Sequence, residues 1–310
     1  MEFGLSPRIV SSTAFLPISE KEYGEIVQAK AGLLEALFVE EKFDLMVENY
    51  LELELCFLES TTQRMVLGNQ DYQWFQVQRN LFNRRLVNLL SACRSYVDYS
   101  KKHIQMILPK EKNAVERIRA AFGKHYDSCL GYRTMDALRN FVQHRGFPIH
   151  AATYNAEWDG KDEESQSIYG LSIYTKTSYL REDGEFKKSV LEELEKLGGR
   201  VNLKPLIRDY VAAMGDVHAG LREMTKQSVE TWDHVVKEAI DRFKTAFPDE
   251  NSLEGLAAVL REKNEFKRPI PVFNDLSEYR RMLQRKNRNL AMLGKRYVSG
   301  EVLKGKPNTI

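Results

Sequence analysis

Apolar residues recur at helical spacing through much of this 310-residue chain, and that recurrence limits the possible folds more than any other feature. The 3.6-residue repeat of an α-helix explains the series Ile26, Ala29, Leu33, Leu34, Leu37 and Phe38. Ser19 and Glu22 precede this series at the spacing of a capping box, so we expect a helix to begin there. Helical character continues through residues 43–60, with a break expected near residues 40–42.

Three further helices are expected before residue 150. Asp71 is placed to cap a second long helix that runs to about Leu108, where Pro109 ends it. A third helix should span about 111–124, and a fourth about 126–145. Four helices joined by short connections favour a mainly α fold class, in the form of an up-and-down helical bundle.

The pattern changes after Pro148. Residues 149–160 and 167–179 are rich in Ile, Tyr, Thr and Ala and alternate in part, which predicts a β-hairpin inserted over about 148–180 with its turn at 159–165. A short helix over 187–197 should end at Gly198 and Gly199. A long helix should then run from about Leu203 to Phe247, with Pro205 in its first turn.

These elements divide the chain into three expected parts. Residues 1–18, which contain two prolines, should be an irregular N-terminus. Residues 19–247 should form the helical bundle with its hairpin. Residues 248–310 should form a small C-terminal helical appendage with a basic tail, and PIPVFN, residues 269–274, should be an extended linker within the appendage.

The composition excludes several classes of protein. Hydrophobic residues make up 43% of the chain and charged residues 29%, which is typical of an ordinary soluble protein. No apolar run approaches the roughly 20 residues of a membrane span, and the first residues do not form a secretory signal, so the default expectation is a cytoplasmic protein with no membrane partner. The cysteines, Cys56, Cys93 and Cys129, are widely spaced and are expected to be reduced core residues. No Cys-x-x-Cys or His-x-x-x-His pattern occurs, so no metal and no cofactor are expected.

The distribution of charged residues along the chain is more informative about partners than the net charge of +2. Eight acidic residues and one lysine lie between Glu35 and Glu59, whereas six basic residues and one aspartate lie between Arg79 and Lys102. A basic helix suits an RNA backbone, but a solvated face balanced by the acidic helix before it fits equally well. From Arg280 to the end, nine basic residues stand against one glutamate. For the basic tail itself, residues 293–310, a partly disordered end is favoured over an RNA contact.

The segment LRNFVQHRGFP carries a candidate active site. Arg139, Asn140 and His144 stand at the end of a helical pattern, and Gly146 and Pro148 should end the helix directly after them. An arginine keeps its proton and can hold a phosphate, while a histidine titrates near neutral pH and can move protons. This pair of groups can cleave a phosphodiester without a metal. The spacing also occurs by chance, and on spacing alone a solvated surface is the favoured interpretation.

The same residues resemble a known family. The run DALRNFVQHRGFPI, residues 136–149, resembles the signature helix end of HEPN domains, whose R-x4-6-H motif usually has a polar residue directly after the arginine, as Asn140 is here. The segment Arg79–Lys102 is similar to the preceding long helix of HEPN-containing bacterial proteins. The residues matched there are Asn83, Arg84, Asn88, Ser91, Ser95 and Asp98. The resemblance covers roughly residues 20–150, and no specific family is recognised beyond Ile149.

The resemblance implies a function. Active HEPN proteins are metal-independent endoribonucleases that act as dimers with both Arg–His pairs facing one cleft, and many are toxins or antiviral defence ribonucleases. On this basis we expect RNA as substrate, a homodimer, and attack of the 2′-hydroxyl that leaves a 2′,3′-cyclic phosphate. The alternative is a non-catalytic nucleotide-binding or interaction protein, such as a sensor or an antitoxin. The expected catalytic residues are Arg139, Asn140 and His144, and the expected substrate-binding residues are Asn83, Arg84, Asn88 and His150.

The substrate-binding candidates also have structural interpretations. Asn83 and Arg84 can orient His144 or hold phosphate, but an inter-helix hydrogen bond that locks the bundle is equally favoured. His150 can be a second proton-transfer group, although a histidine on a strand more often has a satisfied ring nitrogen. The remaining histidines stand singly and are expected to be structural or surface residues.

Overall fold

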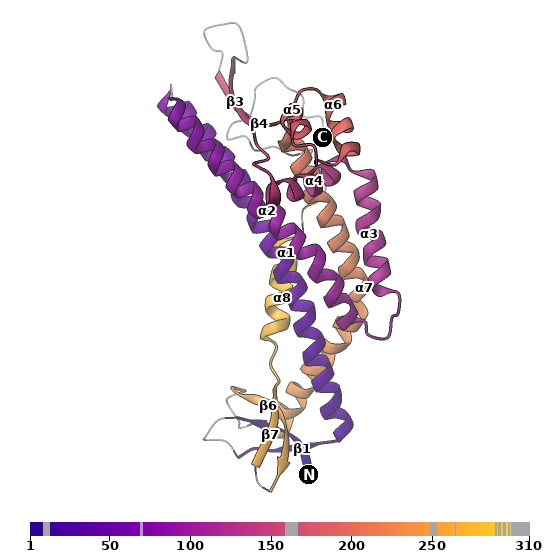
Figure 1. Cartoon of the computed structure of the whole chain (residues 1–310). Coiled ribbons are helices and arrows are strands. Elements are labelled where there is room, and N and C mark those ends of the chain that lie inside the picture. The colour runs from indigo at the N-terminus through magenta and orange to yellow at the C-terminus, as the bar shows by residue number, and fades with distance from the viewer. Residues whose placement is uncertain are drawn as a thin grey trace, which may run out of the picture.

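The computed structural model describes residues 1–8, 13–68, 71–158, 167–248, 253–263, 265–288, 290, 293, 296 and 298. Within these residues the chain is mainly helical with two small antiparallel sheets, which confirms the predicted fold class with its β-hairpin (Figure 1). The longest helices are α1 (Glu20–Leu67), α2 (Tyr72–Ile107) and α7 (Leu203–Ala246). They pack along one another, with α1 between α2 and α7 as the helix that contacts both most extensively.

Helix α1 is continuous over 48 residues, so the expected break near residues 40–42 was wrong. Its start was predicted correctly, because the Ser19 hydroxyl accepts a hydrogen bond from the Glu22 amide and the Glu22 carboxylate accepts one from the Ser19 amide. Two of the polar residues at 40–42, Glu40 and Lys42, have partners on other helices, which favours a continuous helix. The Glu40 carboxylate pairs with side chains of α7, and the Lys42 ammonium lies over the Tyr99 ring of α2.

Two short helices follow α2 and lead to the motif. The Asp71 carboxylate accepts a hydrogen bond from the Trp74 amide at 2.8 Å, so α2 begins at the predicted cap. Helix α3 (Ala114–Ser128) begins later than expected, because residues 109–113 form turns after Pro109. Helix α4 (Leu130–His144) carries the motif and packs on α7.

The contact between α4 and α7 depends on the absence of a side chain at Gly131. A Cβ atom built on this glycine would lie 2.4 Å from the Leu206 carbonyl oxygen, which belongs to the backbone of α7. We therefore expect Gly131→Ala to lower the free energy of unfolding by about 1–3 kcal/mol, since α4 must move to relieve the overlap. Chemical denaturation measures this change. Gly123→Ala is the matched control, because its Cβ would meet no atom within 4 Å and alanine favours a helix. Equal effects of the two substitutions would refute the close contact.

The inserted hairpin belongs to a three-stranded antiparallel sheet in the order β3-β4-β5. Its strands are β3 (Ala151–Trp158), β4 (Ser167–Lys176) and β5 (Arg200–Asn202), and the predicted turn at 159–165 lies outside the described residues. Two short helices, α5 (Thr177–Glu182) and α6 (Lys188–Leu197), stand between β4 and β5. Helix α6 matches the predicted helix over 187–197 and ends at Gly198, whose φ of +123° favours glycine.

Residues 2–18 and residues 256–271 together form a second sheet, which was not expected from the sequence. Strands β1 (Glu2–Pro7), β2 (Leu16–Ile18), β6 (Leu256–Glu262) and β7 (Glu265–Pro271) are antiparallel in the order β2-β1-β6-β7. The expectation of an irregular N-terminus over 1–18 was therefore wrong. The expected helical appendage after 248 contains a helix, but two strands that were not expected precede it. The expected linker PIPVFN begins within β7, and α8 (Asp275–Lys286) follows it.

This second sheet lies at one end of the long helices, whereas the three-stranded sheet and the motif helix lie toward the other end (Figure 1). Nearly all of the predicted basic tail falls outside the described residues. No helix in the described ranges combines the length and the apolar character that crossing a membrane requires.

Candidate functional site

His144 is the last residue of α4, and its side chain is exposed. The helix ends there because the Arg145 amide closes the last turn on the Phe141 carbonyl at 2.9 Å, and Gly146 follows. In the described part of the chain the His144 ring forms no hydrogen bond and no ion pair, whereas the rings of His103, His150 and His218 are all held by partners.

Arg139 and Asn140 contact each other directly. The Arg139 guanidinium donates a hydrogen bond to the Asn140 Oδ1 atom at 3.1 Å. Arg139 is half-buried, and its Nε atom is buried without a partner among the described residues. A polar N–H in this state is costly unless a further acceptor approaches it.

Asn140 and His144 line one cavity of about 260 Å³ at the end of α4. Arg139 does not line this cavity. Within one chain the three motif residues are therefore close in the sequence, but only Asn140 and His144 share the cavity. The other residues that line it are Asp136, Ala137, Phe141, Arg145, Asp183, Glu185, Phe186 and Lys187.

The charges around this cavity are mixed. Three carboxylates, those of Asp136, Asp183 and Glu185, face two permanent cations, Arg145 and Lys187. Arg145 lies 3.7 Å from the Asp183 carboxylate, so part of its charge is already compensated. A phosphate group would therefore find little net attraction from the cavity of a single chain.

Asn83 is buried on α2, and its side chain forms hydrogen bonds with the backbone. Its side-chain amide donates to the Ile149 carbonyl at 3.1 Å, and its Oδ1 atom accepts from the Ile149 amide at 2.9 Å. These two bonds fix the segment that joins α4 to β3. The role is structural, as in the alternative that the sequence offered, but the partner is this connecting segment and not a second helix. Arg84 and Asn88 lie farther along α2, one turn apart, and both are exposed without a partner among the described residues.

His150 lies beside β4 and is half-buried. Its Nδ1 atom accepts a hydrogen bond from the Lys176 amide at 3.0 Å and lies 3.2 Å from the Thr175 hydroxyl. Burial lowers the pKa of His150 to about 4, and the positive charges of Lys176 and Arg79 add to this shift. The ring is therefore neutral at pH 7 and engaged in structure, and it does not line the cavity of His144.

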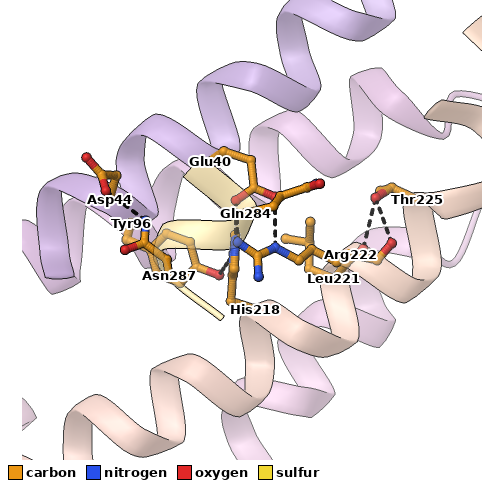
Figure 2. A network of polar contacts seen from close by, with 9 residues as sticks. All are labelled: Glu40, Asp44, Tyr96, His218, Leu221, Arg222, Thr225, Gln284 and Asn287. Atoms are coloured by element: carbon orange, nitrogen blue, oxygen red, sulfur yellow. Dashed lines mark hydrogen bonds and ion pairs between the residues drawn. The ribbon is translucent and has the colours of Figure 1, made fainter. Parts of the chain in front are cut away.

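A buried polar network joins four helices in the middle of the bundle (Figure 2). The Glu40 carboxylate of α1 is at its centre and is only 3% exposed. The His218 Nε2 atom lies 3.0 Å from it, and Arg222 donates to both carboxylate oxygens at 2.9 and 2.6 Å. Gln284 of α8 donates to the same carboxylate at 3.0 Å, and the Tyr96 hydroxyl lies 2.9 Å from the His218 Nδ1 atom.

The protonation states of this network follow from its environment. Burial by itself would raise the pKa of the Glu40 carboxyl, but the hydrogen bonds from His218 and Arg222 outweigh it and lower the pKa to about 2. Burial lowers the pKa of His218, so its ring is neutral at pH 7. A neutral ring with one donor and one acceptor nitrogen fits both contacts: Nε2–H donates to Glu40, and Nδ1 accepts from the Tyr96 hydroxyl.

The sequence analysis missed this network, although one signal was present. Glu40 falls on the apolar face of α1, at helical spacing from Leu33, Ala36 and Phe43. His218 falls in the same way on the apolar face of α7, although the analysis treated it as a single structural or surface residue. A charged residue on an apolar face indicates a buried partner.

Comparisons of this chain with models of known protein families, with curated proteins and with solved structures found no match. Among the described residues no group of three or more His, Cys, Asp or Glu side chains is placed to hold a metal ion. A functional assignment therefore depends on the chemistry of the motif at the end of α4.

Proposed function

We propose that this protein is a metal-independent RNA endonuclease whose catalytic residues are Arg139, Asn140 and His144. The observation that carries the proposal is the uncommitted His144 ring at the exposed end of α4, one turn after an asparagine that contacts the Arg139 guanidinium. The resemblance to HEPN domains, whose motif includes the same three residues, supports it. Following that resemblance, we place the activity in the cytoplasm, in a toxin or antiviral defence role.

In the proposed reaction His144 takes the proton from a ribose 2′-hydroxyl as that oxygen attacks the adjacent phosphorus. The bond from phosphorus to the 5′-oxygen breaks, and the 5′-oxygen receives a proton from a protonated histidine. The products are a 2′,3′-cyclic phosphate and a 5′-hydroxyl end. Arg139 stabilises the negative charge that develops on the phosphoryl oxygens, and Asn140 positions the guanidinium.

This mechanism requires two chains. One His144 cannot be base and acid in the same step, and the permanently charged groups that line the cavity of one chain, three carboxylates and two cations, have no net positive charge. A dimer that brings two motif ends together would supply a second His144 and a second Arg139. Two-fold symmetric dimers are the commonest homo-oligomers.

Exposed apolar side chains on α1 support such an assembly. Phe38 and Leu45 are seven residues apart, as are Leu51, Leu58 and Met65, and each is at least 37% exposed. Seven-residue spacing places side chains on one face of a helix, as in coiled coils. A monomer rarely leaves an apolar face of this extent in contact with water.

The position of Arg139 favours one competing function. Its guanidinium is directed to Asn140 and lies outside the cavity of His144. In this second candidate the motif binds a nucleotide or a protein partner without cleaving RNA, as expected of a sensor or an antitoxin.

Cleavage of RNA in EDTA separates the two functions. Purified protein incubated with single-stranded RNA in excess EDTA should release fragments that mass spectrometry identifies as ending in a 2′,3′-cyclic phosphate. The same oligonucleotide made of DNA is the control and should remain intact, because it lacks the attacking hydroxyl. No cleavage at all, or cleavage that stops in EDTA and returns with magnesium, would contradict the proposed mechanism.

A further inference from the structure

A cavity of about 490 Å³ lies between α1, α7 and α8, beside the buried network. Glu40, Arg222 and Gln284 form part of its wall, and Asp233, Arg280 and Arg281 form another part. None of its lining residues lines the cavity of His144. We infer that this cavity is a second binding site, for a small phosphate ester that also carries N–H donors, which is the chemistry of a mononucleotide.

The first argument is an excess of hydrogen-bond donors. The Asp233 carboxylate already accepts from Ser277, from Arg280 at 2.7 Å and from Arg281 at 2.9 Å. The Glu40 carboxylate is equally occupied, by Arg222, His218 and Gln284. Since each guanidinium has five N–H groups, these two carboxylates leave many of the donors of three arginines unused.

The second argument is a buried donor without an acceptor. Arg280 is only 5% exposed, and its Nε atom has no hydrogen-bond partner among the described residues. Because an unpaired buried N–H costs free energy, a shift of the Arg280 side chain that brings this N–H to a ligand acceptor would remove an existing cost. A phosphate is the natural acceptor, since its oxygens match the geometry of guanidinium groups.

The rim of the cavity adds to the chemistry. Lys226 is exposed there and forms no ion pair within the described ranges, so its ammonium is available to a phosphate. Glu223 and Glu230 are also exposed at the rim and have no cationic partner in those ranges. On α7 they lie three residues before and four residues after Lys226, so their carboxylates stand on either side of its ammonium and suit amino or imino groups of the same ligand. The volume falls within the range of roughly 300–1,000 Å³ that small-molecule sites occupy.

Binding is tested on the full-length protein by isothermal titration calorimetry and thermal unfolding. The probes are adenosine and guanosine 5′-monophosphates, their nucleosides and inorganic phosphate. We expect at least one monophosphate to bind and to raise Tm, because the ligand would connect α8 to α1 and α7. The nucleosides and inorganic phosphate should bind more weakly.

Two variants locate the site. Lys226→Glu breaks no described ion pair, and Lys226→Gln combined with Arg281→Gln removes two cations of the cavity. Each should weaken binding by about tenfold or more, the effect of losing a charge-assisted hydrogen bond. Arg285→Gln is the matched control, since Arg285 is exposed on α8 but does not line the cavity.

The inference is overturned if no monophosphate binds, if the nucleosides or phosphate bind as tightly, or if the two cavity variants bind like wild type while circular dichroism shows them folded. These outcomes do not depend on RNA cleavage.

Discussion

His144→Ala should reduce the rate of RNA cleavage by about 10²- to 10⁴-fold, the usual contribution of a positioned general acid or base. The same substitution should leave Tm close to that of wild type, because the ring is exposed and holds no described partner. Initial rates with a labelled RNA and thermal unfolding measure the two quantities. His234→Ala is the control, since His234 is exposed on α7 outside the motif and should keep full activity.

The dimer can be tested with the same variants. Arg139→Ala and His144→Ala should each be inactive alone. A mixed dimer of the two variants keeps one His144 and one Arg139, whereas each variant alone lacks one of the two groups in both chains. If the two chains share one site, the mixture should therefore be more active than either variant alone, although less active than wild type because the second His144 is missing. A His144→Ala protein that cleaves RNA at the wild-type rate would exclude the proposed mechanism, and a mixture without activity would exclude the shared site.

Glu40→Ala should lower the free energy of unfolding by about 3–5 kcal/mol, the typical cost of removing one partner from a buried charged pair. The substitution leaves the Arg222 guanidinium and the His218 Nε2–H without their acceptor inside the bundle. Because the total stability of a protein is about 5–15 kcal/mol, this loss is a large share of it. Urea denaturation measures it, and Glu41→Ala is the control, as the neighbouring carboxylate is only half-buried.

Lowering the pH should weaken the same interaction. The pKa of Glu40 is about 2 in the folded protein and near 4.5 for an ordinary glutamate, so its stabilisation is fully present above pH 4.5 and is lost as the pH falls toward 2. Wild type should therefore lose stability more steeply than Glu40→Gln between pH 5 and 2, over about the range that the two pKa values define. Equal slopes would show that the Glu40 carboxylate is not held as described.

Local signals in the sequence predicted most of the helices. The Ser19–Glu22 pair and Asp71 located the starts of α1 and α2, and Gly198 located the end of α6. These features act within a few residues, so their sequence spacing is enough. The four-stranded sheet was missed because its central pairing joins residues as far apart as Glu2 and Arg261, and no local pattern specifies such a partner.

The candidate site was likewise predicted only where local sequence signals determine it. The exposure of His144 at a helix end follows from Gly146 and Pro148 nearby in the sequence, and it was predicted. The direction in which the Arg139 side chain points depends on packing, so it was not predicted. The Glu40–His218 pair joins residues 178 positions apart, so only the relative placement of α1 and α7 creates it.

The sheet made from both ends of the chain has a consequence for synthesis. Strand β1 leaves the ribosome before its neighbour β6, which is translated roughly 10–50 s later, at about 5–20 residues per second. During that interval β1 can pair only with β2, and the edge that later binds β6 remains open. An open strand edge is a template for pairing with other chains. A chain that stops before residue 256 keeps that edge permanently, so incomplete copies of this protein should be prone to aggregate through β1, whereas chains translated beyond β6 are protected.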